Sequence, residues 1–359
     1  MVIAKITPCF ENGKGALMGG LVGGVGFGTT ELIVLRPLEQ RAFGEYLHWL
    51  LVSPDFRNAA TAAMYGAGGQ KRVPDEFVRN FAVALPPLRE QSTVAAFLDR
   101  ETGKIDVLVA EQERLMALLK EKRQAVISHA VTKGLDPNVP MKDSGVGWLG
   151  EVPRDWQVLR LGALFREAAE EGEDELPVLS VSIHDGVSDR ELADEEVDRK
   201  VTRSEDRTKY KKVDPGDLVY NMMRAWQGDF GTVSVPGMVS PAYVVARPRG
   251  RFRTEFIELL LRTPKAVEEM RRHSRGVTDF RLRLYWDEFK QIKVALPSPA
   301  DQDRILAAVG KERARSDALA AEGERAIALL KERRAALISA AVTGMIDVRG
   351  LVPDTRQAA

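Results

Sequence analysis

The sequence contains a single cysteine, Cys9, among its 359 residues. This excludes a framework of disulfide bonds and suits a reducing compartment such as the cytoplasm. Lysine plus arginine and aspartate plus glutamate both number 52, and zero net charge argues against a uniformly basic nucleic-acid binder. No basic segment followed by an apolar core opens the chain, so no secretory signal is predicted. The most apolar window, residues 16–35, is rich in glycine and broken by Thr29, Thr30 and Glu31, so no membrane-spanning helix is predicted.

Motifs for catalysis are also missing. GGVGFGT at residues 23–29 has Thr29 where a dinucleotide-binding fingerprint needs its last glycine, and the segment before Lys14 has Pro8 where a phosphate-binding loop needs a glycine. The four histidines are scattered without metal-ligand spacing, and no Asn-Pro-Pro-aromatic tetrapeptide of an adenine methyltransferase occurs. The sequence therefore predicts a chain that is not an enzyme and binds no metal or cofactor.

Charge is segregated along the chain. Residues 167–198 contain thirteen carboxylates and one arginine, whereas residues 199–212 contain seven lysines or arginines and two acids. RRHSRGVTDFRLR at residues 271–283 holds five arginines and one aspartate. Such blocks can direct a basic face toward phosphates, although both could equally be solvated faces of a domain.

One long segment occurs twice. LLKEKRQAVISHAVT at residues 118–132 returns as LLKERRAALISAAVT at residues 329–343, an offset of 211. Over the surrounding stretch, residues 85–136 against 296–347, 24 of 52 positions are identical without a gap. A period of this length is far beyond that of a solenoid repeat, so it indicates a two-fold duplication.

The duplication extends upstream of these segments. Arg36-Pro37 falls on Arg247-Pro248 at the same offset, and FAVALP falls on IKVALP. MVIAKITPCFENG at the start best matches LVYNMMRAWQGDFG, which begins near Leu218. The repeated module is therefore a variable β-rich body followed by a long helix.

The repeated segment predicts an unusually long helix. Pro86 and Pro87 precede it and Gly134 follows it, and from residue 89 to 131 it would be roughly 65 Å long at 1.5 Å per residue. Apolar residues recur at steps of three and four, as in a coiled coil. We expect the two copies to pair antiparallel within one chain, the alternative being that each helix lies on its own domain. The predicted seam comprises Leu98, Ile105, Leu108, Leu115, Leu119 and Val126 in the first copy and Ile305, Val309, Leu319, Leu330 and Leu337 in the second.

A basic loop also recurs. YGAGGQKRVPDEFVRN precedes the first FAVALP strand, and SRGVTDFRLRLYWDEFKQ precedes the second, each with glycine, then basic residues, then Asp-Glu-Phe. Arginine, lysine and glutamine donate in the geometry that base edges and phosphates accept. A surface turn with incidental charge is the alternative. The candidate DNA-binding residues are Gln70, Lys71, Arg72, Lys209, Lys211, Lys212, Arg272, Arg275, Arg281 and Arg283.

Three signatures resemble the specificity subunits of type I restriction-modification systems. SGVGWLGEVPRDWQVLRLG at residues 144–162 is similar to the entry into a target recognition domain of that family. AKITPCFENGKG at residues 4–15 is similar to a recurring stretch inside such a domain. LPPLREQ, the long helix and LLKEKRQAVISHAVTKGLD together resemble the family's conserved spacer region.

The resemblance implies a non-catalytic, cytoplasmic subunit that reads a bipartite target in double-stranded DNA. It also implies docking of two methyltransferase (modification) subunits and of motor-nuclease restriction subunits, with S-adenosylmethionine, ATP and Mg held by those partners. A rigid pair of helices of the predicted length would hold the two target recognition domains apart by at least one turn of DNA, about 34 Å. The alternatives are a coiled-coil adaptor that binds only protein, a truncated, non-functional specificity subunit, and a DNA-modifying enzyme, against which the missing motifs argue.

The predicted fold class is α+β. Two mixed α/β target recognition domains, the first incomplete, are linked by two long helices packed as an antiparallel coiled coil. The predicted segments are residues 1–88 (partial first domain), 89–134 (first helix), 135–150 (linker), 151–298 (second domain), 299–345 (second helix) and 346–359 (tail).

The first copy is expected to lack its front. Residues 143–217, which include PVLSVSIHDG, precede the point in the second copy that is equivalent to Met1 and have no counterpart in the first. Apolar runs such as LIVL at residues 32–35 should then be uncovered, which is a hazard for aggregation. A separate polypeptide could supply the missing piece, or the chain could be a truncated product or begin at a start codon placed too late.

Overall fold

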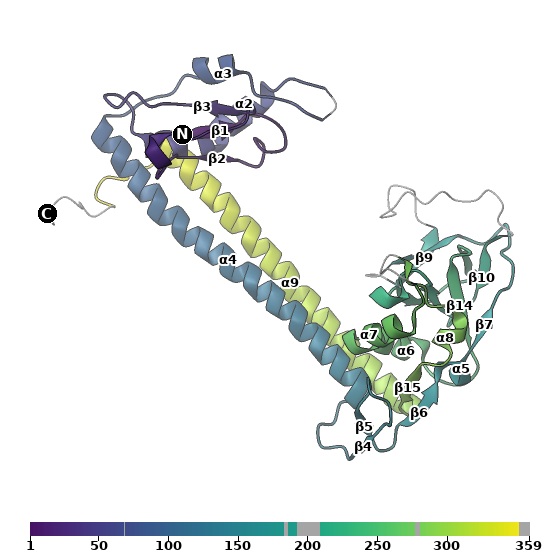
Figure 1. Cartoon of the computed structure of the whole chain (residues 1–359). Coiled ribbons are helices and arrows are strands. Elements are labelled where there is room, and N and C mark those ends of the chain that lie inside the picture. The colour runs from purple at the N-terminus through teal and green to yellow at the C-terminus, as the bar shows by residue number, and fades with distance from the viewer. Residues whose placement is uncertain (68, 183–185, 192–208, 277–280, 352–359) are drawn as a thin grey trace. The chain divides into compact units, whose positions relative to one another are not determined.

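The computed structural model describes residues 1–67, 69–182, 186–191, 209–276 and 281–351. The chain divides into two compact units: unit 1 comprises Met1–Ala117 with Ala320–Ala359, and unit 2 comprises Leu118–Leu319. Each unit combines a β-rich body with one part of each of two long helices, α4 (Leu88–Lys133) and α9 (Pro299–Val342) (Figure 1). The predicted domains ended at the helix termini, whereas the observed units divide both helices between them.

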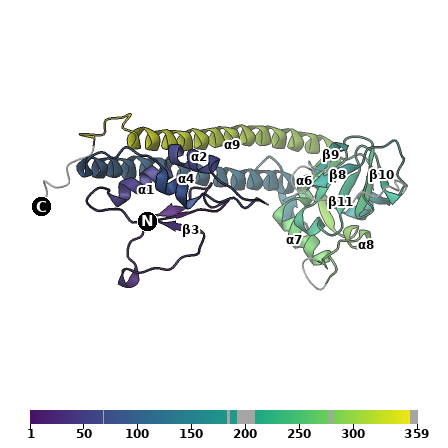
Figure 2. The same cartoon turned by 90° about the horizontal axis from the view of Figure 1, so that it is seen from above.

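The predicted α+β class and the antiparallel helix pair are confirmed. In unit 1, Asp106 on α4 pairs with Arg334 on α9 at 2.8 Å, and Glu113 pairs with Lys331 at 4.0 Å, so α9 numbers fall as α4 numbers rise. In unit 2, Arg123 of α4 pairs with Asp317 of α9 at 2.5 Å. Within each unit the two helices lie side by side in both views (Figure 1, Figure 2).

The buried face of each helix differs in part from the predicted seam. Leu98, Ile105, Ile305 and Val309 are buried, and Leu119, Leu330 and Leu337 are half-buried. Leu108, Leu115, Val126 and Leu319 are exposed. The neighbours Val109 and Met116 are half-buried instead, and Ile127 is buried.

Small residues on α9 explain part of this shift. A Cβ added at Gly323 would lie 3.2 Å from Cγ and Sδ of Met116, so this glycine is what lets the methionine pack across the helix pair. Ser316 is also buried. The seam therefore uses Met116 where the apolar pattern favoured Leu115, because the opposite helix leaves room there.

The apolar core of each body contains the first turns of one long helix and the last turns of the other. In unit 1, Val94 and Leu98 of α4 join Ile338 and Ala341 of α9 in one apolar cluster. In unit 2, the equivalent cluster contains Ile127 and Val131 of α4 with Ile305 and Val309 of α9. This shared burial is why the compact units cut across the helices rather than ending at their termini.

A buried glutamine fastens the start of each helix to its body. Gln91 is fully buried, donates Nε2 to Arg41 O and Pro86 O, and accepts from Phe43 N at 2.7 Å. Gln302, 211 positions later, donates to Pro297 O and accepts from Arg253 N at 2.7 Å. This repeated contact gives a physical reason for the glutamine shared by LPPLREQ and LPSPADQ.

The body of unit 1 is small. A three-stranded sheet in the order β2-β1-β3 lies with short helices over an apolar cluster around Phe10, Tyr46 and Phe56. Its elements are β1 (Val2–Ala4), β2 (Gly15–Ala16), η1 (Val22–Gly24), β3 (Leu32–Val34), α1 (Gly44–Val52), α2 (Pro54–Ala62) and α3 (Asp75–Asn80).

The body of unit 2 is larger. Its main sheet has the order β12-β11-β14-β7, and two-stranded sheets join β10 to β13, β15 to β6, β4 to β5 and β8 to β9. Its elements are β4 (Met141–Asp143), β5 (Glu151–Pro153), β6 (Gln157–Arg160), α5 (Leu161–Leu164), β7 (Phe165–Ala168), β8 (Leu179–Ser182), β9 (Gly186–Glu191), β10 (Lys211–Val213), β11 (Leu218–Asn221), η4 (Ala225–Gln227), β12 (Phe230–Thr232), β13 (Gly237–Val239), β14 (Tyr243–Pro248), α6 (Thr254–Leu261), α7 (Pro264–His273), α8 (Trp286–Phe289) and β15 (Lys293–Leu296).

The sheets of the two units match in register. In unit 1, Val2 of β1 pairs with Val34 of β3, and in unit 2, Val219 of β11 pairs with Val245 of β14. On the other side of β1, β2 pairs antiparallel with it, and β12 pairs antiparallel with β11 in the same way. The alignment of the chain start with the segment near Leu218 is therefore confirmed at the level of strand pairing.

The two sheets differ on the other edge. In unit 2, β7 pairs antiparallel with β14 and Val245 is fully buried. Among the residues that the structure describes, nothing pairs with β3 on the corresponding edge, and Val34 is 55% exposed. The strand β7 belongs to the segment without a counterpart in unit 1. Of the predicted strand PVLSVSIHDG, residues 179–182 form β8, while residues 183–185 lie outside the described residues.

Within the described ranges, no helix is both long and apolar enough to cross a membrane.

Candidate nucleic-acid interface

A tight loop in unit 2 carries the arginines that the sequence singled out. Arg275 and Arg283 exchange two backbone hydrogen bonds of 2.9 Å, which close the loop at its base. Gly276 has a φ of +155°, and a Cβ there would come within 2.5 Å of the backbone oxygen of Arg281. The glycine is therefore required for the close approach that holds this bridged loop (residues 275–283), of which residues 277–280 lie outside the described residues.

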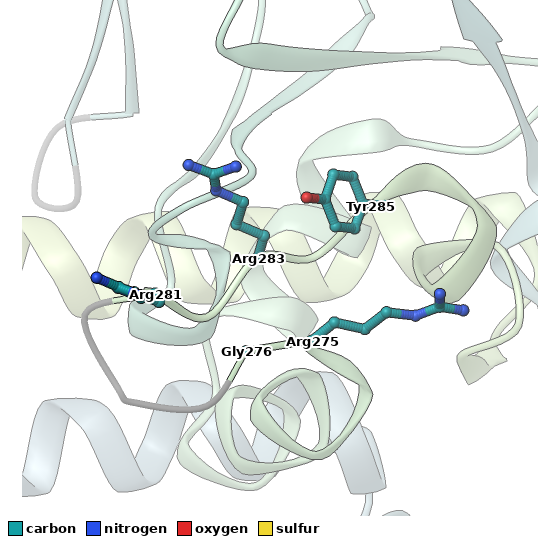
Figure 3. A pocket seen from close by; sticks show the side chains of 5 residues that line it. All are labelled: Arg275, Gly276, Arg281, Arg283 and Tyr285. Atoms are coloured by element: carbon teal, nitrogen blue, oxygen red, sulfur yellow. The ribbon is translucent and has the colours of Figure 1, made fainter.

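The arginine side chains surround an open cavity of about 570 Å³, lined by Arg275, Gly276, Arg281, Arg283 and Tyr285. Arg281 and Arg283 extend to one side, whereas Arg275 turns the other way (Figure 3). Arg275 forms an ion pair with Glu288, so part of its charge is compensated. The sequence reasoning missed Tyr285, which lies two residues after Arg283 and is 42% exposed.

The same loop is built in unit 1. Tyr65 and Arg72 exchange backbone hydrogen bonds of 3.1 and 2.8 Å, and Gly66 has a φ of +141°. The Thr7 hydroxyl fixes this bridged loop (residues 65–72) further, because it accepts from Lys71 N at 3.0 Å and donates to Gly69 O at 2.7 Å. Residue 68 lies outside the described residues. The recurrence predicted from the sequence is thus a repeated backbone structure.

The two loops differ in how their last arginine is held. In unit 1, Arg72 donates from Nε and Nη2 to both carboxylate oxygens of Glu31, at 2.8 to 3.2 Å. These hydrogen bonds lower the pKa of Glu31 and raise the pKa of Arg72. In unit 2, position 31 corresponds to Ala242, and no carboxylate in the described part of the chain pairs with Arg283. The sequence analysis missed Glu31, which lies 41 residues from Arg72.

The remaining candidates lie in other surroundings. Gln70, Lys71 and Lys209 are exposed. Lys211 donates to Tyr243 O at 2.8 Å, and burial lowers the pKa of its amine. Lys212 pairs with Glu173 at 2.5 Å, and Arg272 on α7 pairs with Glu268 at 2.6 Å. These residues are not part of the cavity lining, so the structure brings together Arg275, Arg281 and Arg283 rather than the whole predicted set. Of the basic segment 199–212, residues 199–208 lie outside the described residues.

Asp229, which lies between η4 and β12, is buried and should make the stability of unit 2 depend on pH. Burial raises the pKa of its carboxyl to about 6, and its Oδ1 has no hydrogen-bond partner among the described residues. The folded state therefore binds more protons than the unfolded state between pH 3.8 and about 6, so the stability due to this group is present at lower pH and lost as pH rises through 6.

Asp229→Asn should remove this loss, which is up to about 3 kcal/mol. Urea unfolding of the full chain at pH 4.5 and pH 8 measures it: the free energy of unfolding of the variant should exceed that of wild type by more at pH 8 than at pH 4.5, where only part of the loss has occurred. An equal difference between the two proteins at both pH values would contradict this account.

Among the described residues, no group of three or more histidine, cysteine, aspartate or glutamate side chains is arranged to hold a metal ion.

Comparisons with known proteins bear on this arrangement. No family model matches the chain. The specificity subunits of the type I restriction enzymes EcoAI and EcoEI of Escherichia coli are 42% and 40% identical over 118 residues, which make up 33% of this chain and 20% of each relative. The specificity subunit of EcoBI, also from Escherichia coli, is 25% identical over 296 residues, covering 76% of this chain and 60% of the relative.

The match therefore spans one fifth of the length of the first two relatives. A solved chain from work on complex assembly and conformational transition of the type I R-M system has the same fold, with a TM-score of 0.65 at 17% identity. It aligns over 89% of this chain and 75% of its own length. The resemblance to type I specificity subunits noted in the sequence is confirmed by these relatives and by the shared fold.

Proposed function

We propose that this chain is the sequence-specific DNA-recognition subunit of a type I restriction-modification complex and has no catalytic activity of its own. The observation that carries the proposal is the bridged loop, which occurs at the same place in both β-rich bodies and carries basic side chains each time, Lys71 and Arg72 in unit 1 and Arg275, Arg281 and Arg283 in unit 2. Two copies of one reading element suit a target in two halves. Arginine suits it because its planar fork matches both guanine edges and phosphates.

The long helices are proposed to set the distance between the half-sites and to dock the partners. Leu108, Leu115, Leu118 and Leu329 are exposed on α4 and α9 within their own units, and such apolar stripes support a protein interface. The proposed partners are two methyltransferase subunits and the motor-nuclease subunits, which would carry S-adenosylmethionine, ATP and Mg. The proposed location is the cytoplasm, where the single cysteine remains reduced.

A coiled-coil adaptor that binds only protein is the second reading of the same helices. Its bodies would dock protein rather than DNA. The affinity for duplex DNA separates the two readings, because phosphate contacts make log K fall linearly with log salt. If the chain does not bind duplex DNA even at low salt, where phosphate contacts are strongest, the adaptor is favoured.

The arginines of the cavity provide the direct test. Arg281→Ala and Arg283→Ala, measured separately, should each weaken binding of DNA selected from a random duplex library by the chain with its modification subunits. Loss of a base contact should relax selectivity in one half of the target by about 1–3 kcal/mol, whereas loss of a phosphate contact should lower affinity evenly and reduce the salt slope by about one. Arg304→Ala is the matched control, since Arg304 on α9 lies outside the cavity, pairs with Asp301 and is not among the candidate DNA-binding residues. Unchanged binding by both cavity variants would remove this loop from the interface.

A further inference from the structure

The two bridged loops place an arginine at equivalent positions but surround it differently. Backbone hydrogen bonds show the equivalence: Val73 N donates to Lys5 O in unit 1, and Leu284 N donates to Met222 O in unit 2, both at 2.8 Å. Glu31 in unit 1 and Ala242 in unit 2 are also equivalent. Lys5 N donates to Glu31 O, and Met222 N donates to Ala242 O. A carboxylate therefore pairs with Arg72, whereas the position in unit 2 that is equivalent to Glu31 is an alanine, Ala242.

We propose that Glu31 is a positioning residue that fixes Arg72 to read a guanine, and that unit 1 thereby reads a base where unit 2 binds phosphate through Arg283. This rests on the proposed function. It assigns a role to Glu31, which lies on no motif of the sequence.

The geometry of the guanidinium supports base reading. Glu31 occupies Nε and one hydrogen of Nη2, at 3.0 and 2.8 Å, in a two-point contact that fixes the plane of the group. Arginine has five N–H donors, so both hydrogens of Nη1 and the second hydrogen of Nη2 remain. These lie on the outer edge of the fork, which matches the N7 and O6 acceptors of guanine in the major groove.

The charge of the pair supports the same reading. Glu31 and Arg72 together carry no net charge, so the pair has little attraction for a phosphate. Their side chains are 34% and 37% exposed, so the outer edge is accessible to a ligand. Lys71, which precedes Arg72 in the chain and is exposed, is the phosphate contact that we assign to this loop.

Arg283 is the opposite case. With Ala242 in place of the glutamate, Arg283 has no carboxylate partner among the described residues, and it lines the cavity together with Arg281 (Figure 3). A free arginine gains most from a phosphate, since the long-range attraction does not depend on a fixed orientation.

The experiment uses the full chain in complex with its modification subunits and a random-sequence duplex DNA library. Targets are selected with wild type, and binding is measured for single-base variants of the selected duplex over a range of salt concentrations. Arg72→Ala and Glu31→Ala should both lose preference for the same guanine, by roughly 5- to 150-fold for Arg72→Ala. The double variant should lose no more than Arg72→Ala alone, because Glu31 acts through the arginine.

The salt dependence separates this role from a structural one. The Glu31→Ala/Arg72→Ala double variant removes a neutral pair and should leave the salt slope unchanged, whereas Arg283→Ala should reduce it by about one. Glu31→Ala should steepen the slope, because the released arginine can reach phosphate. Ala242→Glu should have the reverse effect on unit 2, giving a shallower slope.

Two results would overturn the inference while leaving the proposed function intact. One is a target in which no base pair depends on both Glu31 and Arg72. The other is a salt slope that falls for Arg72→Ala with selectivity unchanged, which would make Arg72 a phosphate contact. A wild-type complex that selects no sequence would overturn the proposed function together with this inference.

Discussion

Leu98→Asp is expected to abolish the cooperative folding of unit 1. Leu98 is fully buried where α4 enters the core beside Ile338 and Ala341 of α9. Removing its side chain costs about 2–5 kcal/mol, and burying an unpaired carboxylate adds a desolvation cost of several more. Together these approach the whole stability of a typical domain, about 5–15 kcal/mol. Thermal unfolding of the full chain should then show only the transition of unit 2.

Leu108→Asp is the matched control on the same helix. The heptad pattern places both leucines on one seam, but Leu108 is 47% exposed in the structure. Its replacement should change stability by no more than about 0.5 kcal/mol. Under the proposed function it should instead weaken co-purification of the methyltransferase subunit. Equal destabilisation by the two variants would show that the helices pair through the heptad positions rather than through the observed face.

Arg247→Ala is expected to have the second-largest effect. Arg247 on β14 donates to both oxygens of Asp217, at 2.9 to 3.2 Å, and pairs with Glu170 and Asp214. The Asp217 side chain is only 2% exposed, so removing the arginine leaves a buried charge without its partner. Breaking such a pair costs about 3–5 kcal/mol.

The duplication supplies the control for this prediction. Arg36 is the equivalent residue in unit 1, where it is exposed and has no carboxylate partner in the described part of the chain. Arg36→Ala should therefore stay within about 0.5 kcal/mol of wild type in urea unfolding. Asp217→Asn should recover part of the loss when added to Arg247→Ala, since it removes the buried charge. A similar cost at both arginines would mean that the Asp217 contact contributes little.

The sequence was sufficient to find the duplication and most of its architecture. A fixed offset of 211 over many identities requires two similar structures, and the strand pairing of Val2 with Val34 and of Val219 with Val245 agrees with it. Long helices could be predicted because proline and glycine occur only at their limits or at tolerated positions. The recurrence of the basic loop was visible for the same reason.

The helix face could not be settled from one helix at a time. The pattern favoured Leu108 and Leu115 because they continue the coiled-coil spacing from Leu98 and Ile105, yet Met116 packs against the opposite helix. The decision depends on Gly323, which lies more than two hundred residues away and admits the methionine. Complementary shapes on two helices decide such a seam, and periodicity within one helix does not contain that information.

What the sequence by itself determined was the kind of side chain at the candidate site: a glycine that permits a tight loop, followed by basic residues. What only the tertiary structure decided was which charges remain available. Arg72 is held by Glu31 and Arg275 by Glu288, whereas Arg283 has no carboxylate partner among the residues that the structure describes. An ion pair depends on distances of about 3 Å between atoms that chain separation does not predict, so folding alone determines which arginine is oriented and which is free.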